Sequence, residues 1–209
     1  MNDFSMDKND PDTFFTVEDK IQSVELKVKG SKFIASIIHS PNKIIADTKY
    51  QQIKKKYHDA THNCFAYRIT ENDFRYSDDG EPSGTAGLPI FKVLENSDIF
   101  EVLLVVTRYF GGTKLGTGGL ARAYSDTALE CIKSSKKIVK TKYVTINLQM
   151  TYTRYNDLLR LVSKFNGKFK QSDYQDKIDL TLHIPKSKFN LFQTEFEQNF
   201  YDINNVKKT

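Results

Sequence analysis

The sequence predicts an α+β protein that is divided into two domains. Segments of strand type alternate with segments of helical period along the chain. An apolar run at 102–106 leads into a glycine-rich segment at 108–119, and a helical pattern follows directly. Beyond residue 138 the predicted elements start a second, regular order. A chain of 209 residues is long enough for two small domains or one large one.

The first domain begins with a hairpin and a helix. Residues 24–28 alternate apolar and polar side chains, a Gly-Ser turn follows, and residues 32–38 resume the strand pattern. Ser40 and Pro41 have the cap and early-proline chemistry of a helix start. The complete predicted order is strands at 24–28 and 32–38, a helix at 40–57, strands at 64–69 and 74–76, a helix at 88–94, a strand at 99–109 and a helix at 120–134.

The second domain is predicted from the order of its elements. A linker near 134–137 precedes them. They are a strand at 143–150, a helix at 155–162, paired strands at 168–174 and 177–184, a helix at 189–196 and a last short strand at 203–206. This β-α-β-β-α-β order is that of the ferredoxin-like fold.

Charge is distributed unevenly along the chain. Residues 1–19 carry one Lys against six acidic side chains, whereas 20–137 carry 18 basic and 13 acidic ones and 138–209 carry 12 and 7. We expect residues 1–12, which are polar and acidic, to be disordered. The two remaining parts are basic, and a basic surface favours acidic partners such as RNA. A solvated lysine-rich surface explains the same surplus, so charge alone leaves both interpretations open.

The cysteine count and the amino terminus indicate a cytoplasmic protein with no membrane partner. Cys64 and Cys131 are the two cysteines, too few for a disulfide framework or a thiolate zinc site. Residues 1–11 lack the basic and apolar regions of a signal peptide. No apolar run approaches the roughly 20 residues that span a bilayer.

The glycine-rich segment is the first candidate site. It holds five of the 10 glycines, between a strand of buried type and a helix. Such a segment presents free amides and the positive end of the helix dipole to an anion. The candidate anion- or nucleic-acid-binding residues are Arg108, Gly111, Gly112, Lys114, Gly116, Gly118 and Gly119. A tight strand-to-helix connection without a ligand is the alternative. Tyr109 and Phe110 either stack on nucleobases or belong to the core.

An acidic segment at 76–89 is the second candidate site. Its Gly, Pro, Ser and Asp residues predict a loop, but three acids in four positions exceed what a turn requires. The candidate polar patch consists of His62, Asn63, Asp78, Asp79 and Glu81. The acids of this patch could bind a divalent cation, form a catalytic pair, cap turns, or pair with Arg108 and Lys114.

Two further arrangements bear on metal binding and catalysis. His58 and His62 are four residues apart, a spacing that would place both on one face of a helix and suit zinc. The Glu of a zinc-protease motif is absent between them, and hydrogen bonding that orders the acidic loop is the alternative. Cys64 would need a base and a lowered pKa to act as a nucleophile, and a buried strand cysteine is the better interpretation. We therefore assign no catalytic residue, metal ion or cofactor.

Three segments of the first domain form a specific combination. They are Asp-Ala-Thr-His-Asn-Cys-Phe-Ala at 59–66, Ser-Asp-Asp-Gly-Glu-Pro-Ser-Gly-Thr-Ala-Gly at 77–87 and the glycine-rich segment with the following leucine at 108–120. Together they resemble the signature of the IMPACT family and its bacterial YigZ-like branch, most strongly over residues 20–135. The resemblance implies a first domain, at 13–137, with the fold of a ribosomal small-subunit protein and of domain IV of the translocating elongation factor. The second domain, at 138–209, would resemble the ferredoxin-like domain V of that factor.

The resemblance implies a translation-associated regulator rather than an enzyme. Its partner would be RNA, the ribosome or a translation factor. We expect the glycine-rich segment, Arg108, the acidic loop and His62 to meet in the cleft that binds it. Eukaryotic relatives restrain activation of a starvation-sensing translation kinase. That role is not carried over, because this chain has its second domain in place of their partner-binding domain.

Two other classes of function stay open. Some bacterial relatives carry a proline-dipeptidase label, but such enzymes bind two metals through dispersed Asp, His and Glu residues, and this chain has four histidines. Small-molecule kinases share the fold class of the first domain, and residues 116–121 resemble their phosphate loop only loosely. A module that binds a small anion, such as phosphate or a nucleotide, is the third hypothesis.

Overall fold

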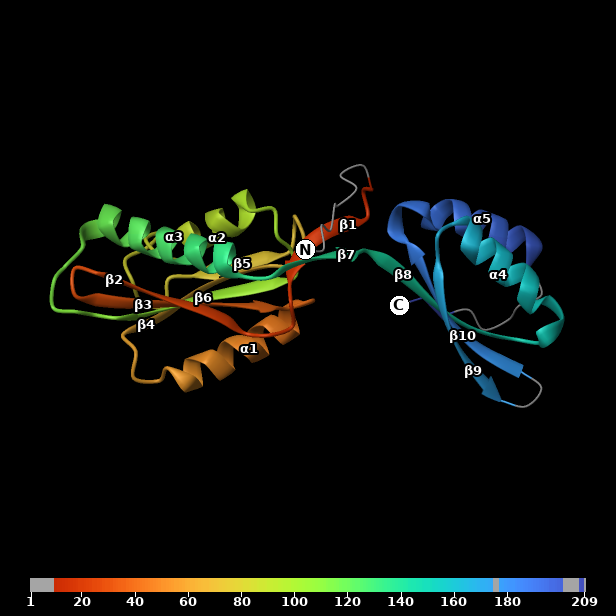
Figure 1. Ribbon diagram of the computed structural model, residues 1–209, viewed down its shortest axis with the longest axis horizontal. Helices are drawn as coiled ribbons and strands as arrows, with labels where there is room; N and C mark the ends of the chain where they lie inside the picture. The colour runs from red at the N-terminus through yellow and green to blue at the C-terminus, as the bar shows by residue number, and fades with distance from the viewer. Residues whose placement is uncertain (1–9, 175–176, 201–206, 209) are drawn as a thin grey trace. The chain divides into compact units, whose positions relative to one another are not determined.

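The structure is a computed structural model that describes residues 10–174, 177–200 and 207–208. The chain divides into two compact units (Figure 1). The N-terminal unit comprises Phe14–Val139, and the C-terminal unit comprises Lys140–Thr209 together with Met1–Thr13. Among the described residues no helix is both long and apolar enough to cross a bilayer.

The N-terminal unit is built on a five-stranded antiparallel sheet with the strand order β2-β3-β6-β4-β5. Its strands are β2 (Gln22–Val28), β3 (Ser31–His39), β4 (His62–Arg68), β5 (Phe74–Ser77) and β6 (Val102–Tyr109). Helix α1 (Lys43–Lys56) covers one face of the sheet, and α2 (Gly87–Asn96) and α3 (Gly116–Ser134) cover the other (Figure 1). Because both faces are covered, the central strand β6 is a continuous apolar run rather than an alternating one.

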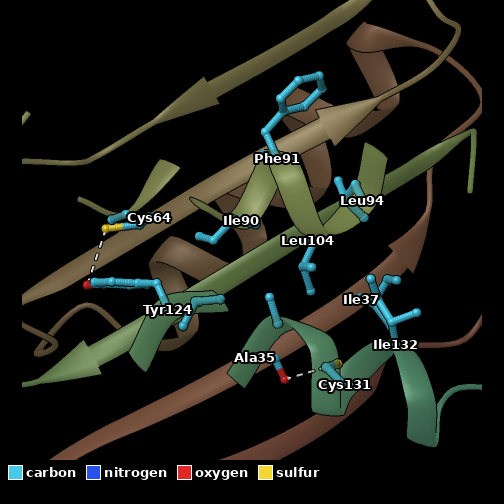
Figure 2. Packing of buried hydrophobic residues seen from close by; sticks show 14 of the residues in the cluster. Ala35, Ile37, Cys64, Ile90, Phe91, Leu94, Leu104, Tyr124, Cys131 and Ile132 are labelled. Atoms are coloured by element: carbon cyan, nitrogen blue, oxygen red, sulfur yellow. Dashed lines mark hydrogen bonds between the residues drawn. The ribbon is translucent and has the colours of Figure 1, made fainter. Parts of the chain in front are cut away.

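Two apolar clusters hold this sheet between its helices. The larger cluster joins the sheet to α2 and α3 and includes the fully buried Ile90, Leu104 and Tyr124 (Figure 2). Both cysteines belong to it: the Cys64 thiol lies 3.4 Å from the Tyr124 hydroxyl, and the Cys131 thiol lies 3.7 Å from the carbonyl oxygen of Ala35 (Figure 2). A second cluster packs α1 against the opposite face. The sheet is therefore a rigid base for the loops at its edges.

The C-terminal unit has a four-stranded antiparallel sheet in the order β11-β8-β10-β9. In chain order its elements are β8 (Tyr143–Met150), η1 (Tyr152–Arg154), α4 (Tyr155–Lys164), β9 (Lys168–Tyr174), β10 (Lys177–Pro185), η2 (Lys186–Lys188), α5 (Phe189–Asn199) and β11 (Lys207–Lys208). Helices α4 and α5 share one apolar cluster with alternate residues of β10, so both lie on the same face of the sheet (Figure 1). The predicted ferredoxin-like fold is confirmed. The strand predicted at 203–206 lies outside the described residues.

Two helix starts differ from the prediction. Helix α1 is capped by Asn42, whose side-chain oxygen accepts a hydrogen bond from the Ile45 amide at 3.0 Å, whereas the predicted cap Ser40 is buried. Helix α3 begins at Gly116, four residues before the apolar pattern that predicted it. Three of the five clustered glycines therefore belong to the start of a helix and not to a loop.

The segments next to the division between the units are also ordered. The predicted linker at 134–137 ends in β7 (Lys137–Thr141), which pairs with β1 (Thr13–Val17), and the sequence analysis predicted neither strand. Of the tail predicted to be disordered, residues 1–9 lie outside the described residues. Residues 10–12 are ordered, because the Asp12 carboxylate accepts hydrogen bonds from the Ser187 amide at 2.9 Å and the Ser187 hydroxyl at 2.6 Å.

We expect Asn42→Ala to lower the free energy of unfolding by about 1 kcal/mol, because it removes the side-chain cap of α1. Denaturant unfolding followed by circular dichroism measures this loss. Asn72→Ala, at an exposed turn position, is the matched control and should leave stability within about 0.5 kcal/mol of the wild type. Equal stabilities of the Asn42→Ala and Asn72→Ala proteins would contradict the assigned cap.

Candidate functional site

The two candidate segments meet at one pocket of the N-terminal unit. The pocket has a volume of about 380 Å³ and lies at the amino end of α3. It is lined by Glu81 of the acidic loop, Arg108 of β6, and Phe110 and residues 114–117 of the connection into α3. Arg108, the glycine-rich segment through Gly116 and the acidic loop through Glu81 thus meet as expected. His62, which was also expected there, does not line this pocket.

A buried ion pair borders this pocket. Arg108 Nη1 donates to Glu81 Oε1 at 2.6 Å, and the two side chains are only 6% and 3% exposed. Burying two charges has a large desolvation cost, which close pairing and further hydrogen bonds must offset. The Tyr124 hydroxyl donates to the same Glu81 oxygen at 2.8 Å, and Arg108 Nη2 lies 3.4 Å from Ser31 Oγ. The pair therefore ties the acidic loop to the sheet and to α3.

Arg108 keeps an unused donor in this arrangement. Among the described residues its Nε has no hydrogen-bond acceptor, although the residue as a whole is 5% exposed. Its guanidinium carbon lies 5.5 Å from the ring centroids of both Phe33 and Phe110, at a distance compatible with cation–π attraction. A buried donor without an acceptor costs free energy, and here it belongs to a residue that lines the pocket.

Asp78 has a structural role at the start of α2. Its Oδ1 accepts hydrogen bonds from the amides of Ala86 and Gly87 at 2.9 and 2.8 Å, and its Oδ2 accepts one from the Gly84 amide at 2.9 Å. A carboxylate placed here satisfies the otherwise unpaired amides of the helix start and opposes the helix dipole. The start of α2 lies close to the Ser77 backbone, and glycine at position 87 allows this contact, since a Cβ there would lie 2.7 Å from that backbone.

Asp79, His62 and Asn63 form a second polar group beside the ion pair. Asp79 accepts hydrogen bonds from the Asn63 amide at 2.7 Å and from the Lys54 ammonium at 3.0 Å. His62 Nδ1 donates to the Asp79 carbonyl oxygen at 2.8 Å, because a carbonyl only accepts. His62 Nε2 then faces Glu81 Oε1 at 3.9 Å. The predicted polar patch is thus assembled, and its polar atoms are engaged mainly with one another and with the backbone.

The helical histidine pair that zinc would require is not formed. Helix α1 ends at Lys56, so His58 lies in a turn and His62 is the first residue of β4. In the part of the chain that the structure describes, no group of three or more His, Cys, Asp or Glu side chains could hold a metal ion. From β4, His62 instead donates a hydrogen bond to the Asp79 carbonyl oxygen of the acidic loop. Hydrogen bonding that orders this loop was the alternative interpretation.

Cys64 occupies a core position. Its thiol lies 2.9 Å from the Asp78 carbonyl oxygen, and burial raises the pKa of this thiol far above its usual range. Burial also raises the pKa of the Cys131 thiol, to about 11, and that of the Tyr124 hydroxyl. These groups keep their protons at neutral pH, which does not suit a nucleophile.

Backbone geometry explains three glycines of the glycine-rich segment without any ligand. A Cβ on Gly111 would lie 1.9 Å from the Gly30 carbonyl carbon, and the Gly111 amide donates to Ser31 Oγ at 3.2 Å. This close contact packs the β2–β3 turn against the connection into α3. Gly112 and Gly116 have φ angles of 85° and 71°, in the left-handed region that favours glycine.

Gly118 has no comparable explanation within the fold. It lies in the first turn of α3 without a positive φ, and a Cβ there would meet no atom within 4 Å. Glycine at such a position destabilises a helix by roughly 0.5–1 kcal/mol relative to alanine. Gly119 is partly explained by packing, because a Cβ added there would lie 3.2 Å from Leu115 Cβ. The space in front of Gly118 is open.

The amino end of α3 is electropositive. Its N-cap residue is Leu115, which has no side-chain acceptor, and no acidic residue lies in its first turn. Arg108 and Glu81 balance each other in charge. Lys114, which is exposed and lines the pocket, therefore adds a net positive charge to the positive end of the helix dipole.

Sequence reasoning missed part of this arrangement. Thr117 and Leu115 line the pocket but were not among the candidate residues. The helical spacing of Leu120 and Tyr124 indicates that both face the core, and both are buried. No sequence signal pairs the Tyr124 hydroxyl with Glu81, which lies 43 positions away.

Comparison with known proteins finds relatives that match both units. A sequence model of the Impact N-terminal domain matches residues 29–132. The IMPACT family member YvyE of Bacillus subtilis (strain 168) is 33% identical over 182 residues, which are 86% of this chain and 83% of that protein. The IMPACT family member YigZ of Escherichia coli (strain K12) is 33% identical over 166 residues, 78% of this chain and 81% of that protein. A crystal structure of a hypothetical protein is 28% identical, with a TM-score of 0.66 over 94% of this chain and 96% of that one.

We expect Asp78→Ala to lower the free energy of unfolding by about 2–3 kcal/mol, because two amides at the start of α2 and the loop amide of Gly84 lose a charged acceptor. Denaturant unfolding measures the change. Ser83→Ala, at an exposed position in the same loop, should change stability by less than about 0.5 kcal/mol. A similarly small effect of Asp78→Ala would show that its carboxylate is not the cap.

Both thiols should resist modification in the folded protein, because burial excludes the reagent and raises their pKa values. Titration with a disulfide reagent at pH 8 should detect no thiol in the native protein and two per chain in denaturant. Rapid reaction of one native thiol that disappears in Cys64→Ser would restore the nucleophile hypothesis.

Proposed function

The chain belongs to the IMPACT family, and from this premise we propose that it is a cytoplasmic, translation-associated regulator. Its partner in this proposal is RNA, the ribosome or a translation factor. The surface that binds the partner is the pocket at the amino end of α3.

The charge balance of the pocket is the observation that carries this proposal. Arg108 and Glu81 neutralise each other, whereas Lys114 and the uncapped end of α3 have no acidic counterpart in that first turn. A positive concave surface attracts anionic partners and raises their rate of association. Phe110, half-exposed beside this charge, adds an aromatic face of the kind that nucleobases stack on.

The architecture of the two units gives further support. The C-terminal unit has the ferredoxin-like strand order, and the N-terminal unit carries helices on both faces of its sheet. The family resemblance implies that these two folds correspond to neighbouring domains of an elongation factor that acts on the ribosome. Fold similarity of this kind supports the class of function, and the pocket supports the specific binding surface.

Several observations favour binding over catalysis. The carboxylate of Asp78 is occupied by backbone amides, and that of Glu81 by Arg108 and Tyr124. The Cys64 thiol is held protonated in the core. A small-anion receptor is the second candidate function, because a volume of about 380 Å³ lies within the range of small-molecule sites.

Ribosome co-sedimentation tests the proposal. Lys114→Ala is the appropriate variant, because Lys114 is exposed and its removal leaves the buried ion pair intact. Arg108→Ala is unsuitable, since it would strand the Glu81 charge in the interior at a cost of about 3–5 kcal/mol. Lys133→Ala, at the exposed carboxyl end of the same helix, is the matched control.

We expect the wild type and Lys133→Ala to pellet with ribosomes at low salt and to dissociate as salt is raised, because phosphate contacts release counterions. Lys114→Ala should bind several-fold more weakly and with a shallower dependence on salt. If wild-type protein stays in the supernatant at low salt, direct ribosome binding is excluded as the main role. Equal binding by Lys114→Ala and Lys133→Ala would place the interface elsewhere.

A further inference from the structure

We infer that the pocket at the amino end of α3 binds the phosphate group of a nucleotide and that Phe110 stacks on its base. The inference rests on the proposed function, because it names the ligand chemistry of the same pocket. It assigns the phosphate to the first amides of α3 and the base to Phe110.

The start of α3 has the form of an anion receptor. The first amides of a helix have no acceptor within the helix, and α3 supplies none from a capping side chain. The amides of Gly116, Thr117 and Gly118 are in this first turn, and the first two of these residues line the pocket. Phosphate oxygens are suitable acceptors for such amides, and the helix dipole favours their charge.

Gly118 indicates that something outside the chain approaches this turn. Alanine at this position would meet no atom within 4 Å and would favour the helix. Gly112 and Gly116 are explained by a positive φ and Gly111 by its close contact with Gly30. Gly119 is explained in part by the Leu115 side chain. Gly118 does not itself line the pocket but directly follows Thr117, which does. A ligand that approaches this turn explains the glycine, since a Cβ would occupy part of the open space in front of the amides.

Arg108 provides an independent indication of a ligand. It is 95% buried, as its exposed fraction of 5% shows, and it lines the pocket. Its Nε has no acceptor among the described residues, even though Nη1 and Nη2 have Glu81 and Ser31. A guanidinium that is pre-oriented by a carboxylate and retains one donor is well suited to a phosphate oxygen. The Nε atom itself is buried, and a ligand that draws the guanidinium toward the pocket would give it an acceptor.

The carboxylate of Glu81 does not oppose an anion here. Its Oε1 already accepts hydrogen bonds from Arg108 and Tyr124, so its charge is largely compensated within the protein. Lys114 and the dipole of α3 then determine the sign of the potential in the pocket.

Phe110 supplies the contact to the base. The residue is 47% exposed, although it directly follows a buried strand. One side of the ring lies 5.5 Å from the Arg108 guanidinium, which fixes the ring at the pocket. The exposed remainder of the ring can stack on a base next to the phosphate, and this contact accepts any base.

The test compares three probes: inorganic phosphate, uridine 5′-monophosphate and a fluorescein-labelled octauridylate. Amide NMR shifts report where the first two bind, and fluorescence anisotropy measures the affinity of the third. We expect all three probes to shift the amides of residues 116–118. Octauridylate that binds much more tightly than the monophosphate would identify RNA as the source of the phosphate, whereas equal affinities would identify a free nucleotide.

Gly118→Ala is the sharpest variant. We expect it to raise the melting temperature, because alanine favours the helix, and to weaken all three probes about tenfold by obstructing the amides. Phe110→Ala should weaken both nucleotides by about five- to a hundredfold and leave inorganic phosphate unchanged. Lys133→Ala should bind every probe as the wild type does. Wild-type affinity in Gly118→Ala, or amide shifts confined to other parts of the chain, would overturn the inference.

The outcome is separable from that of the proposed function. If the amides of residues 116–118 respond to the probes but ribosomes do not pellet the protein, the phosphate pocket stands and the ribosome proposal fails. If ribosomes pellet wild type and Gly118→Ala equally and no probe moves these amides, the proposed function stands and the pocket inference fails.

Discussion

Arg108 and Glu81 place two opposite charges 2.6 Å apart inside the N-terminal unit, and the shape of the candidate site depends on that contact. Neither charge would be tolerated alone at such burial, so each requires the other and the additional hydrogen bonds from Tyr124 and Ser31. The residues involved come from the acidic loop, β6, α3 and the start of β3. One ion pair thereby holds four separate parts of the chain around the pocket at the amino end of α3.

This constraint divides the polar residues into two sets. Asp78, Asp79 and Glu81 face inward to amides and cations of the protein itself, so the acidic loop acts as a scaffold. Among the described residues of the site, Lys114 and the first amides of α3 have no acceptor from a side chain. The Nε of Arg108 also has no acceptor among them. All of these are donors or cations. A surface of this kind selects anions by charge and by hydrogen-bond direction, which is consistent with a partner that carries phosphate.

The family membership is shown by matches that extend over both units. It is the premise from which the function of the pocket is proposed. The crystal structure with a TM-score of 0.66 covers nearly the whole of both chains, so the two-unit layout is shared with it as well. Within that layout the ion pair and the capped start of α2 concern stability, whereas the open start of α3 is the part that we propose for recognition. The two kinds of residue can therefore be separated by mutation.

Local sequence determined much of this protein. The alternating and continuous apolar runs predicted the strands of the two larger sheets other than β11, and the order of elements predicted the ferredoxin-like unit, because periodicity and turn chemistry act over a few residues. Clustered glycines and acids predicted a site in this region, and of these residues Gly116 and Glu81 line the pocket. Tertiary structure decided what each residue does there. Gly111 is needed because Gly30 approaches it from 81 positions away in the chain, and Glu81 is bound by Tyr124 from 43 positions away. Asp78 became a helix cap because α2 starts nine residues later, beside it in space. Such contacts depend on how distant segments pack, and no local pattern encodes that packing.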